Sequence, residues 1–196
     1  MKKIDVKKMV TMALLIAIIV VFQLTAGMLP KLPGGANISL VLIPIVLGSA
    51  LYGPGAGALL GAIFGAIVFY FSAIGADGVG FAMFQDNPIL CFTVCIIKST
   101  LAGFASGWIY KLLKKTNGYL AMLLASIACP VINTGIFMAS VSLFFNTTVI
   151  DSDGVKTAIV SLFGAILLLN AIPELFINIL FSPAGQRILL AVQKNR

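Results

Sequence analysis

An apolar stretch from Gly53 to Phe71, GPGAGALLGAIFGAIVFYF, limits what this chain can fold into because small residues recur in it at helical spacing. Gly57, Gly61 and Gly65 are four residues apart, and an alanine follows each of them. Residues at this spacing lie on one face of a helix. Helices in lipid associate mainly through close backbone approach at small residues, since burying leucine against leucine gains little over burying it against acyl chains. We therefore expect this helix to be the packing centre of a membrane bundle.

The composition also indicates an integral membrane protein. Of the 196 residues, 60% are hydrophobic and only 10% are charged, which lies outside the range of soluble domains. A membrane-spanning helix needs about 20 apolar residues, so the length allows about six spans, and we expect residues 1–196 to form a single membrane domain. Histidine is absent, which excludes imidazole bases and histidine-ligated metals. We expect neither a metal nor a cofactor.

The apolar runs predict an all-α integral membrane protein built as a six-transmembrane-helix bundle. Clusters of proline, glycine and polar residues separate the runs. We expect the spans at about residues 9–28, 38–52, 56–74, 89–110, 119–145 and 157–181. Pro44 and Pro130 fall inside two of these spans and predict kinks, because proline removes a backbone donor. Residues 75–88 and 146–156 are expected to form loops.

Basic residues are distributed unevenly between the two sides of this topology. One side carries Lys2, Lys3, Lys7, Lys8, Lys111, Lys114, Lys115, Arg187, Lys194 and Arg196, and the other carries Lys31 and Lys156. Because cytoplasmic loops are enriched in lysine and arginine, both termini are predicted to be cytoplasmic. The topology accounts for the net charge of +7, so membrane lipid is the expected surrounding and no nucleic-acid partner is indicated.

Two charged residues are predicted to lie within the membrane, where a charge usually faces a cavity or a partner. Lys98 is about nine residues into its span, or about 14 Å deep at roughly 1.5 Å per residue. We interpret it as a counter-charge for an anionic ligand that enters from outside; the alternative is a lysine whose ammonium reaches back to the interface. Glu174 is expected about two helical turns from that depth, so we expect it to pair locally or with a partner protein.

Further candidate ligand-binding residues are uncharged. Asn133 follows Pro130, where a kink opens space between helices, and its amide can bind either a ligand or a neighbouring helix. Gln85 and Asn87, together with the ring of Phe84, are predicted to line an outer pocket at the start of the fourth span. Solvation of these loop residues is the alternative.

The motifs that are missing restrict the function. The sequence contains no GxxxxGK[ST] phosphate-binding loop, so ATP hydrolysis by that mechanism is not expected. With no histidine and no paired intramembrane acids, we do not expect an enzyme. A ligand-capturing membrane subunit that takes energy from a partner fits these features. A membrane scaffold is the alternative; it would explain the glycines but not Lys98.

Several stretches resemble the substrate-binding S components of energy-coupling factor (ECF) vitamin transporters, and the resemblance covers essentially the whole chain. The matching residues are ISLVLIPIVLG at 38–48, LYGP at 51–54, the stripe from Gly57 to Gly65, Asn87-Pro88, Lys98, Ile109-Tyr110-Lys111 and Ile172-Pro173-Glu174. Ala13 and Ala17 match the AxxxA motif of the family's first helix, which docks onto the transmembrane coupling protein.

The resemblance implies a multi-pass protein of the bacterial plasma membrane that binds one vitamin tightly from outside. It further implies association with an ECF coupling protein and two cytoplasmic ATPase subunits, and toppling of the protein in the membrane to release its cargo. The stretch at 38–48 is most similar to the pantothenate-type branch, and Lys98 would suit a carboxylate, although that branch usually carries arginine near this position. Riboflavin and folate are the alternative substrates.

Overall fold

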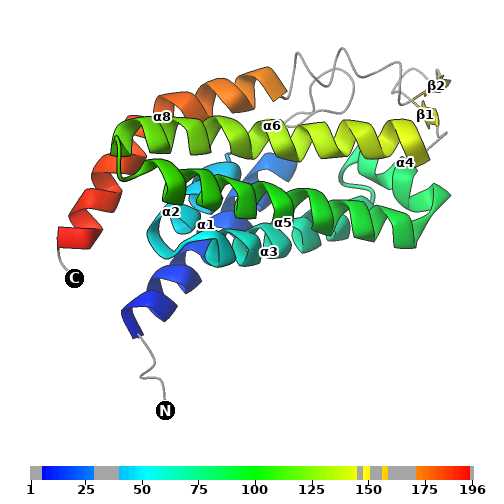
Figure 1. Cartoon of the computed structure of the whole chain (residues 1–196). Helices are drawn as coiled ribbons and strands as arrows, with labels where there is room; N and C mark the ends of the chain where they lie inside the picture. The colour runs from blue at the N-terminus through cyan, green and yellow to red at the C-terminus, as the bar shows by residue number, and fades with distance from the viewer. Residues whose placement is uncertain (1–5, 29–39, 145–147, 151–155, 159–170, 195–196) are drawn as a thin grey trace.

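The structure, a computed structural model, describes residues 6–28, 40–144, 148–150, 156–158 and 171–194. These residues are helical apart from one short hairpin (Figure 1). The helices are α1 (Val6–Met28), α2 (Leu42–Tyr52), α3 (Pro54–Ala73), α4 (Gly78–Asp86), α5 (Pro88–Leu113), α6 (Gly118–Phe144) and α8 (Ile172–Lys194). In the hairpin, β1 (Thr148–Ile150) pairs antiparallel with β2 (Lys156–Ala158), with Val149 opposite Thr157. The prediction of an all-α membrane fold is confirmed at this level.

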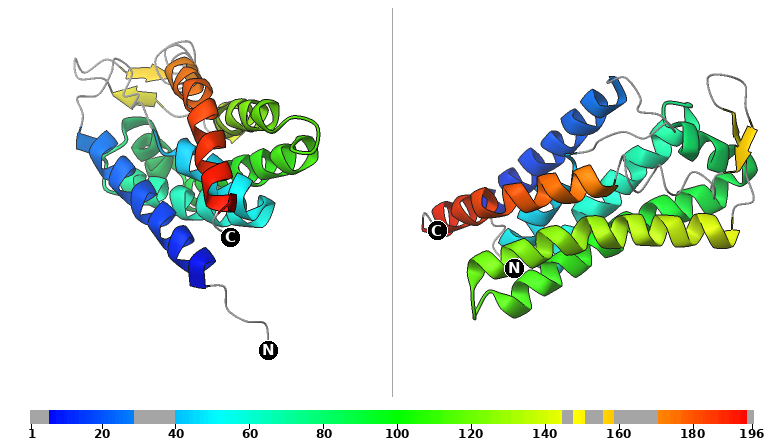
Figure 2. Two further views of the ribbon diagram at one scale, coloured as in Figure 1. Left: turned by 90° about the vertical axis from the view of Figure 1, so that its left-hand side faces the viewer. Right: turned by 90° about the horizontal axis from the view of Figure 1, so that it is seen from above.

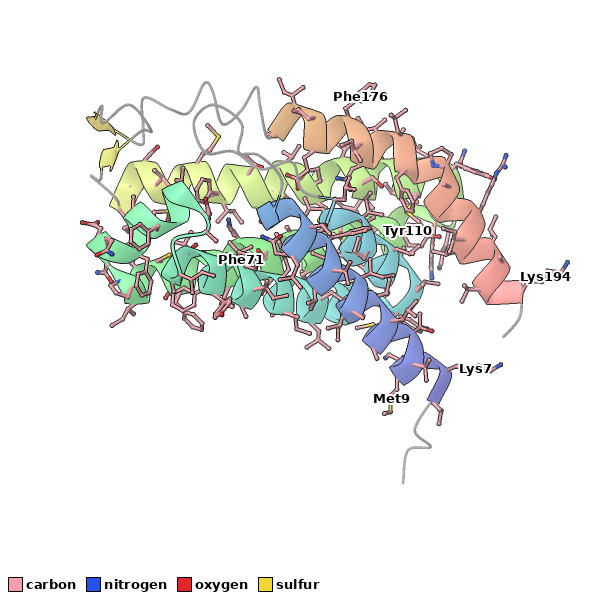
Figure 3. All side chains as sticks on the ribbon, turned by 180° about the vertical axis from the view of Figure 1, so that it is seen from behind. Lys7, Met9, Phe71, Tyr110, Phe176 and Lys194 are labelled. Carbon is pink, nitrogen blue, oxygen red and sulfur yellow. The ribbon has the colours of Figure 1, made fainter. Side chains whose placement is uncertain are left out.

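Five of the described helices, α1, α3, α5, α6 and α8, are long and apolar enough to cross a membrane. Helices α3, α5 and α6 run lengthwise side by side, and α1 crosses the bundle obliquely (Figures 1 and 2). The start of α1 and the end of α8 lie at the same end of the bundle, where Figure 3 labels Lys7 and Lys194. We call this the terminal end. Helix α4 and the hairpin lie at the opposite end, the hairpin end (Figure 1).

Helices α3 and α5 form the most extensive packing pair among the described elements. A Cβ atom added to any glycine of the α3 stripe would clash with a backbone carbonyl of α5. The pairs are Gly57 with Gly103, Gly61 with Ser99, and Gly65 with Cys95. Each step of four residues forward along α3 is a step of four residues back along α5, so the helices are antiparallel and in backbone contact. The prediction that this stripe is the packing centre is confirmed.

Local sequence explains where these helices begin and end. Gly53 adopts a φ of 89°, which favours glycine, and its N–H donates to the Ser49 carbonyl at 2.8 Å to close α2. Pro54 is the first residue of α3. A backbone N–H at this position would have no intrahelical acceptor, so the missing N–H of proline costs no hydrogen bond. Asn87 caps α5, since its Oδ1 accepts from the Leu90 N–H at 3.1 Å.

The expected loop at residues 75–88 is wrong, because α4 occupies most of it. Val79 and Met83, four residues apart, are buried in an apolar cluster with the start of α5. Gly80 lets α4 approach α3 so closely that an added Cβ would clash with the Ser72 hydroxyl. This packing stabilises a short helix, although the glycines and aspartates of the stretch are typical of a loop.

The expected last span at residues 157–181 is also placed wrongly. Thr157 lies in β2, residues 159–170 are outside the described part of the chain, and α8 continues past Phe181 to Lys194. Pro183 lies inside this helix without ending it. Buried Ser182 and Leu189 on either side of Pro183 hold α8 in the bundle, so tertiary packing overrides the local stop signal.

The predicted kink at Pro44 is not found, whereas the one at Pro130 stays a prediction. Helix α2 begins only at Leu42, which places Pro44 in its first turn, where backbone N–H groups lack intrahelical acceptors in any case. Pro44 therefore does not interrupt α2. Helix α6 runs continuously from Gly118 to Phe144 and contains Pro130 within it.

Candidate functional site

Lys98 lies in the middle of α5, and only 9% of its surface is exposed. Its Nζ atom sits 4.4 Å from the ring centroid of Phe137 on α6, close enough for an attractive cation–π contact. Within the described residues, Lys98 Nζ has neither a hydrogen bond nor an ion pair. The ammonium therefore lies between α5 and α6, and its three donor hydrogens have no acceptor within the described part of the chain.

Asn133 lies one turn before Phe137 on α6 and is buried beside the same region of α5. Its Oδ1 accepts a long hydrogen bond of 3.5 Å from the hydroxyl of Ser99, the residue after Lys98. The Nδ2 group of Asn133 makes no hydrogen bond with any residue that the structure describes. The structure thus brings Lys98 and Asn133 together, each with a donor group that no described residue accepts from.

The sequence places Glu174 about two helical turns in depth from Lys98 and so predicts no direct pair between them. In the structure, Glu174 lies in the first turn of α8, is 5% exposed, and its carboxylate interacts electrostatically with Lys98. The two side chains, both described, are nevertheless not in direct ion-pair contact. A nearby opposite charge lowers the free energy needed to bury an ionised carboxylate.

Polar side chains continue from Glu174 along one face of α8, a feature that the sequence reasoning missed. This polar stripe consists of Glu174, Asn178, Ser182 and Gln186, all buried and each four residues from the next. Asn178 Nδ2 donates to the Glu174 carbonyl at 2.8 Å, and Gln186 Oε1 accepts from the Tyr110 hydroxyl at 3.3 Å. Phe176, which Figure 3 labels, points away from the bundle. The four-residue spacing that revealed the glycine stripe was also present here.

The three residues predicted at the outer pocket lie at the hairpin end. Phe84 is half-buried on α4, with its ring centroid 5.7 Å from that of Phe69, and it belongs to the same apolar cluster as Phe137. Gln85 and Asn87 are exposed. Asn87 precedes Lys98 by about eleven residues, or roughly 16 Å of helix. Phe84 is therefore continuous with the Lys98 region through apolar contacts, whereas Gln85 and Asn87 are not gathered around it.

The two alanines of the AxxxA motif are exposed on α1. The apolar residues Val10 and Leu14 beside them are 62% and 59% exposed. In contrast to the α3 glycines, this small-residue pair is not covered by any described part of the chain. Ala13 and Ala17 therefore leave a shallow face on which another helix can pack closely.

Comparison with known proteins gives two matches. The sequence model of the family "ECF transporter, substrate-specific component" matches residues 7–184. The chain is also 28% identical over 193 residues to the pantothenic acid transporter PanT of Lactococcus lactis subsp. cremoris, and the alignment covers 94% of each chain.

The family match spans most of the chain, including α1 to α6 and the polar stripe of α8 up to Ser182. It agrees with five apolar helices able to cross a membrane. This protein therefore belongs to the substrate-specific components of ECF transporters, which are multi-pass, non-enzymatic, substrate-binding membrane proteins.

Proposed function

We propose that this chain binds pantothenate from outside the cell and delivers it for ATP-driven import. The observation that carries the proposal is the buried Lys98 ammonium in the middle of α5, beside Asn133 and within electrostatic reach of Glu174. A buried charge in a membrane helix is expected to serve a ligand or a partner. The name of the relative, a pantothenic acid transporter, supports the same substrate.

The chemistry of pantothenate matches these three side chains. The vitamin carries a carboxylate at one end, an amide in the middle and two hydroxyl groups at the other end. In our proposal the carboxylate accepts from Lys98, the amide carbonyl accepts from Asn133 Nδ2, and a hydroxyl donates to Glu174. Phe84, Gln85 and Asn87 line the approach from the hairpin end. Folate also offers a carboxylate, whereas riboflavin offers none and would leave Lys98 without an anionic partner.

We further propose that the protein crosses the bacterial plasma membrane six times as a single domain, with both termini in the cytoplasm. Helix α1 begins and α8 ends at the same end of the bundle. A chain that starts and finishes on one side of a membrane crosses it an even number of times. Helix α2 has 11 residues, too few to span alone, and in our proposal it belongs to the second crossing, which the sequence predicts at residues 38–52. The excess of lysine and arginine at the terminal end favours the cytoplasmic side.

A thermal-shift screen of the detergent-solubilised protein tests the substrate. The vitamins are pantothenate, folate, riboflavin, thiamin, biotin and pyridoxine, and we expect pantothenate alone to stabilise the protein. A ligand at about 100 times its Kd should add roughly 2.7 kcal/mol to the stability of the folded state. A shift with another vitamin and none with pantothenate would refute the proposed substrate while leaving the family assignment intact.

We propose that α1 docks onto the ECF coupling protein, which joins two ATPase subunits to this chain. Replacing both Ala13 and Ala17 by leucine should abolish vitamin uptake while leaving vitamin binding unchanged, because bulky side chains prevent close helix approach. Uptake into proteoliposomes that contain the complete transporter measures the first effect, and a thermal shift of the isolated subunit measures the second.

A matched control is available on α6, where Gly135 and Ala139 form another exposed small pair at the same spacing. Their double leucine variant should retain uptake. If the α1 variant instead loses vitamin binding, the alanines support packing within the subunit and the docking proposal is wrong.

A further inference from the structure

A basic cavity of about 460 Å³ opens at the terminal end, away from the Lys98 region. It lies between the start of α1, the turn from α2 to α3, and the end of α5. Lys8, Lys111 and Lys114 line it, and no acidic residue is among the described residues around it. The cavity therefore concentrates positive charge in a space large enough for an anionic group.

The lysines come from two elements far apart in the sequence, α1 and the end of α5, so the fold brings Lys8 to the other two. Lys8 belongs to the first turns of α1, Lys111 to the last turn of α5, and Lys114 follows α5 directly. Lys8 Nζ lies 5.7 Å from the ring centroid of Tyr52, which places this ammonium beside the cavity. The buried side of the cavity includes Tyr110, which Figure 3 shows inside the bundle.

The backbone at the turn adds to the positive potential. Helix α3 begins here at Pro54, and a helix N-terminus carries partial positive charge. A Cβ added to Gly53 or Gly55 would meet no atom within 4 Å. An anion can therefore approach this turn closely without meeting a side chain.

The surroundings indicate that the anion belongs to a lipid. Trp108, on the α5 turn before Lys111, is 52% exposed, and exposed tryptophan is typical of the membrane–water interface. Met9 and Leu112 are exposed apolar residues directly beside Lys8 and Lys111, and Figure 3 shows Met9 pointing away from the bundle. The exposed apolar residues could therefore contact the acyl chains of a lipid while the adjacent lysines bind its headgroup.

We propose that this cavity binds the phosphate of an anionic phospholipid, such as phosphatidylglycerol. Lysines near a membrane surface attract anionic lipids, and here three of them converge on a preformed hollow. Inorganic phosphate shares the same recognition chemistry but has no acyl chains to contact the apolar residues, so it should bind more weakly. The site is independent of the vitamin site proposed above.

Native mass spectrometry of the detergent-solubilised protein, titrated with phosphatidylglycerol or phosphatidylcholine, tests this site. The variant combines Lys8→Gln, Lys111→Gln and Lys114→Gln, and its charge-matched control combines Lys7→Gln, Lys115→Gln and Lys194→Gln, none of which lines the cavity. We expect the variant to lose its preference for phosphatidylglycerol by about fivefold per lysine, whereas the control keeps it.

Two outcomes would overturn the proposal. Equal phosphatidylglycerol binding by the variant and the control would show that the cavity is not a lipid site. Stabilisation by inorganic phosphate that needs these lysines, without any preference for phosphatidylglycerol, would assign the site to a soluble anion. Should the triple variant misfold, the single substitutions Lys111→Gln and Lys115→Gln repeat the comparison. The vitamin-induced thermal shift should be the same in all variants, so failure of this proposal is separate from failure of the vitamin proposal.

Discussion

Replacing Gly61 by valine should destabilise the folded bundle by about 3 kcal/mol, the upper part of the range for overpacked cores. The first atom added, Cβ, would already clash with the Ser99 carbonyl of α5. A flexible side chain could move aside, but here the backbone of a whole helix must shift. Neighbouring contacts at Gly57 and Gly65 would be lost with it. The unfolded fraction as a function of added SDS, in mixed micelles, measures the change.

Gly135→Val is the matched control for this prediction. Gly135 lies in the interior of α6, and an added Cβ there would meet no atom within 4 Å. The substitution is chemically the same and the helical setting is comparable, so only the interhelical contact differs. Equal losses of stability in the two variants would mean that helix propensity, and not α3–α5 contact, accounts for the effect.

Replacing Lys98 by alanine should weaken pantothenate binding by about 1.5 to 3 kcal/mol, the range for a hydrogen bond to a charged group. That is roughly a 10- to 150-fold rise in Kd. Isothermal titration of the solubilised protein gives the Kd directly. Because Glu174 interacts electrostatically with Lys98, the variant's stability without ligand must be measured as well, so that a folding defect is not counted as a binding defect.

The pantothenate alcohol, in which a hydroxymethyl group replaces the carboxylate, identifies the ligand group that Lys98 contacts. If the ammonium binds the carboxylate, the alcohol should bind the wild-type protein more weakly than pantothenate does. The Lys98→Ala substitution should then weaken binding of the alcohol only slightly further. Such non-additivity is expected of two groups in direct contact. Lys115→Ala, an exposed lysine at the terminal end, should bind both ligands like the wild type. Additive losses would place Lys98 away from the carboxylate.

The sequence was sufficient to predict the α3–α5 pair because the relevant physics is local. Regular glycine spacing defines a face, Gly53 and Pro54 mark the start of α3, and Asn87 with Pro88 marks the start of α5. Lys98 and Asn133 were also singled out correctly as buried polar residues, since any polar group in a long apolar helix must find a partner or a cavity. Their role in binding vitamin is still a prediction.

The last helix could not be placed from local signals. Ser182-Pro183 resembles a helix end, yet α8 continues because buried side chains beyond it pack into the bundle. Because of this error, the prediction placed Glu174 deep within a span, whereas it lies in the first turn of α8. Its electrostatic interaction with Lys98 depends on how α8 lies against α5 and α6, which no single segment specifies.

The polar stripe of α8 was missed for a different reason. Taken singly, Asn178, Ser182 and Gln186 are ordinary polar residues of an apolar segment and predict no site. Only their common spacing shows that they share a face with Glu174. A periodicity search for polar residues in apolar helices would have found the stripe without a structure.

The backbone contact between α3 and α5 also restricts how the protein can move. Helices separated by long side chains can shear, because rotamers adjust as one helix slides on another. Here Gly57 meets Gly103 and Gly61 meets Ser99 without intervening side chains, so a slide of less than one turn drives alanine or leucine into a carbonyl. We therefore expect the pair to behave as one rigid body through the transport cycle. Rearrangements that accompany capture or release of cargo would then involve the helices that pack less tightly around the α3–α5 pair, including α1 with its exposed alanine face.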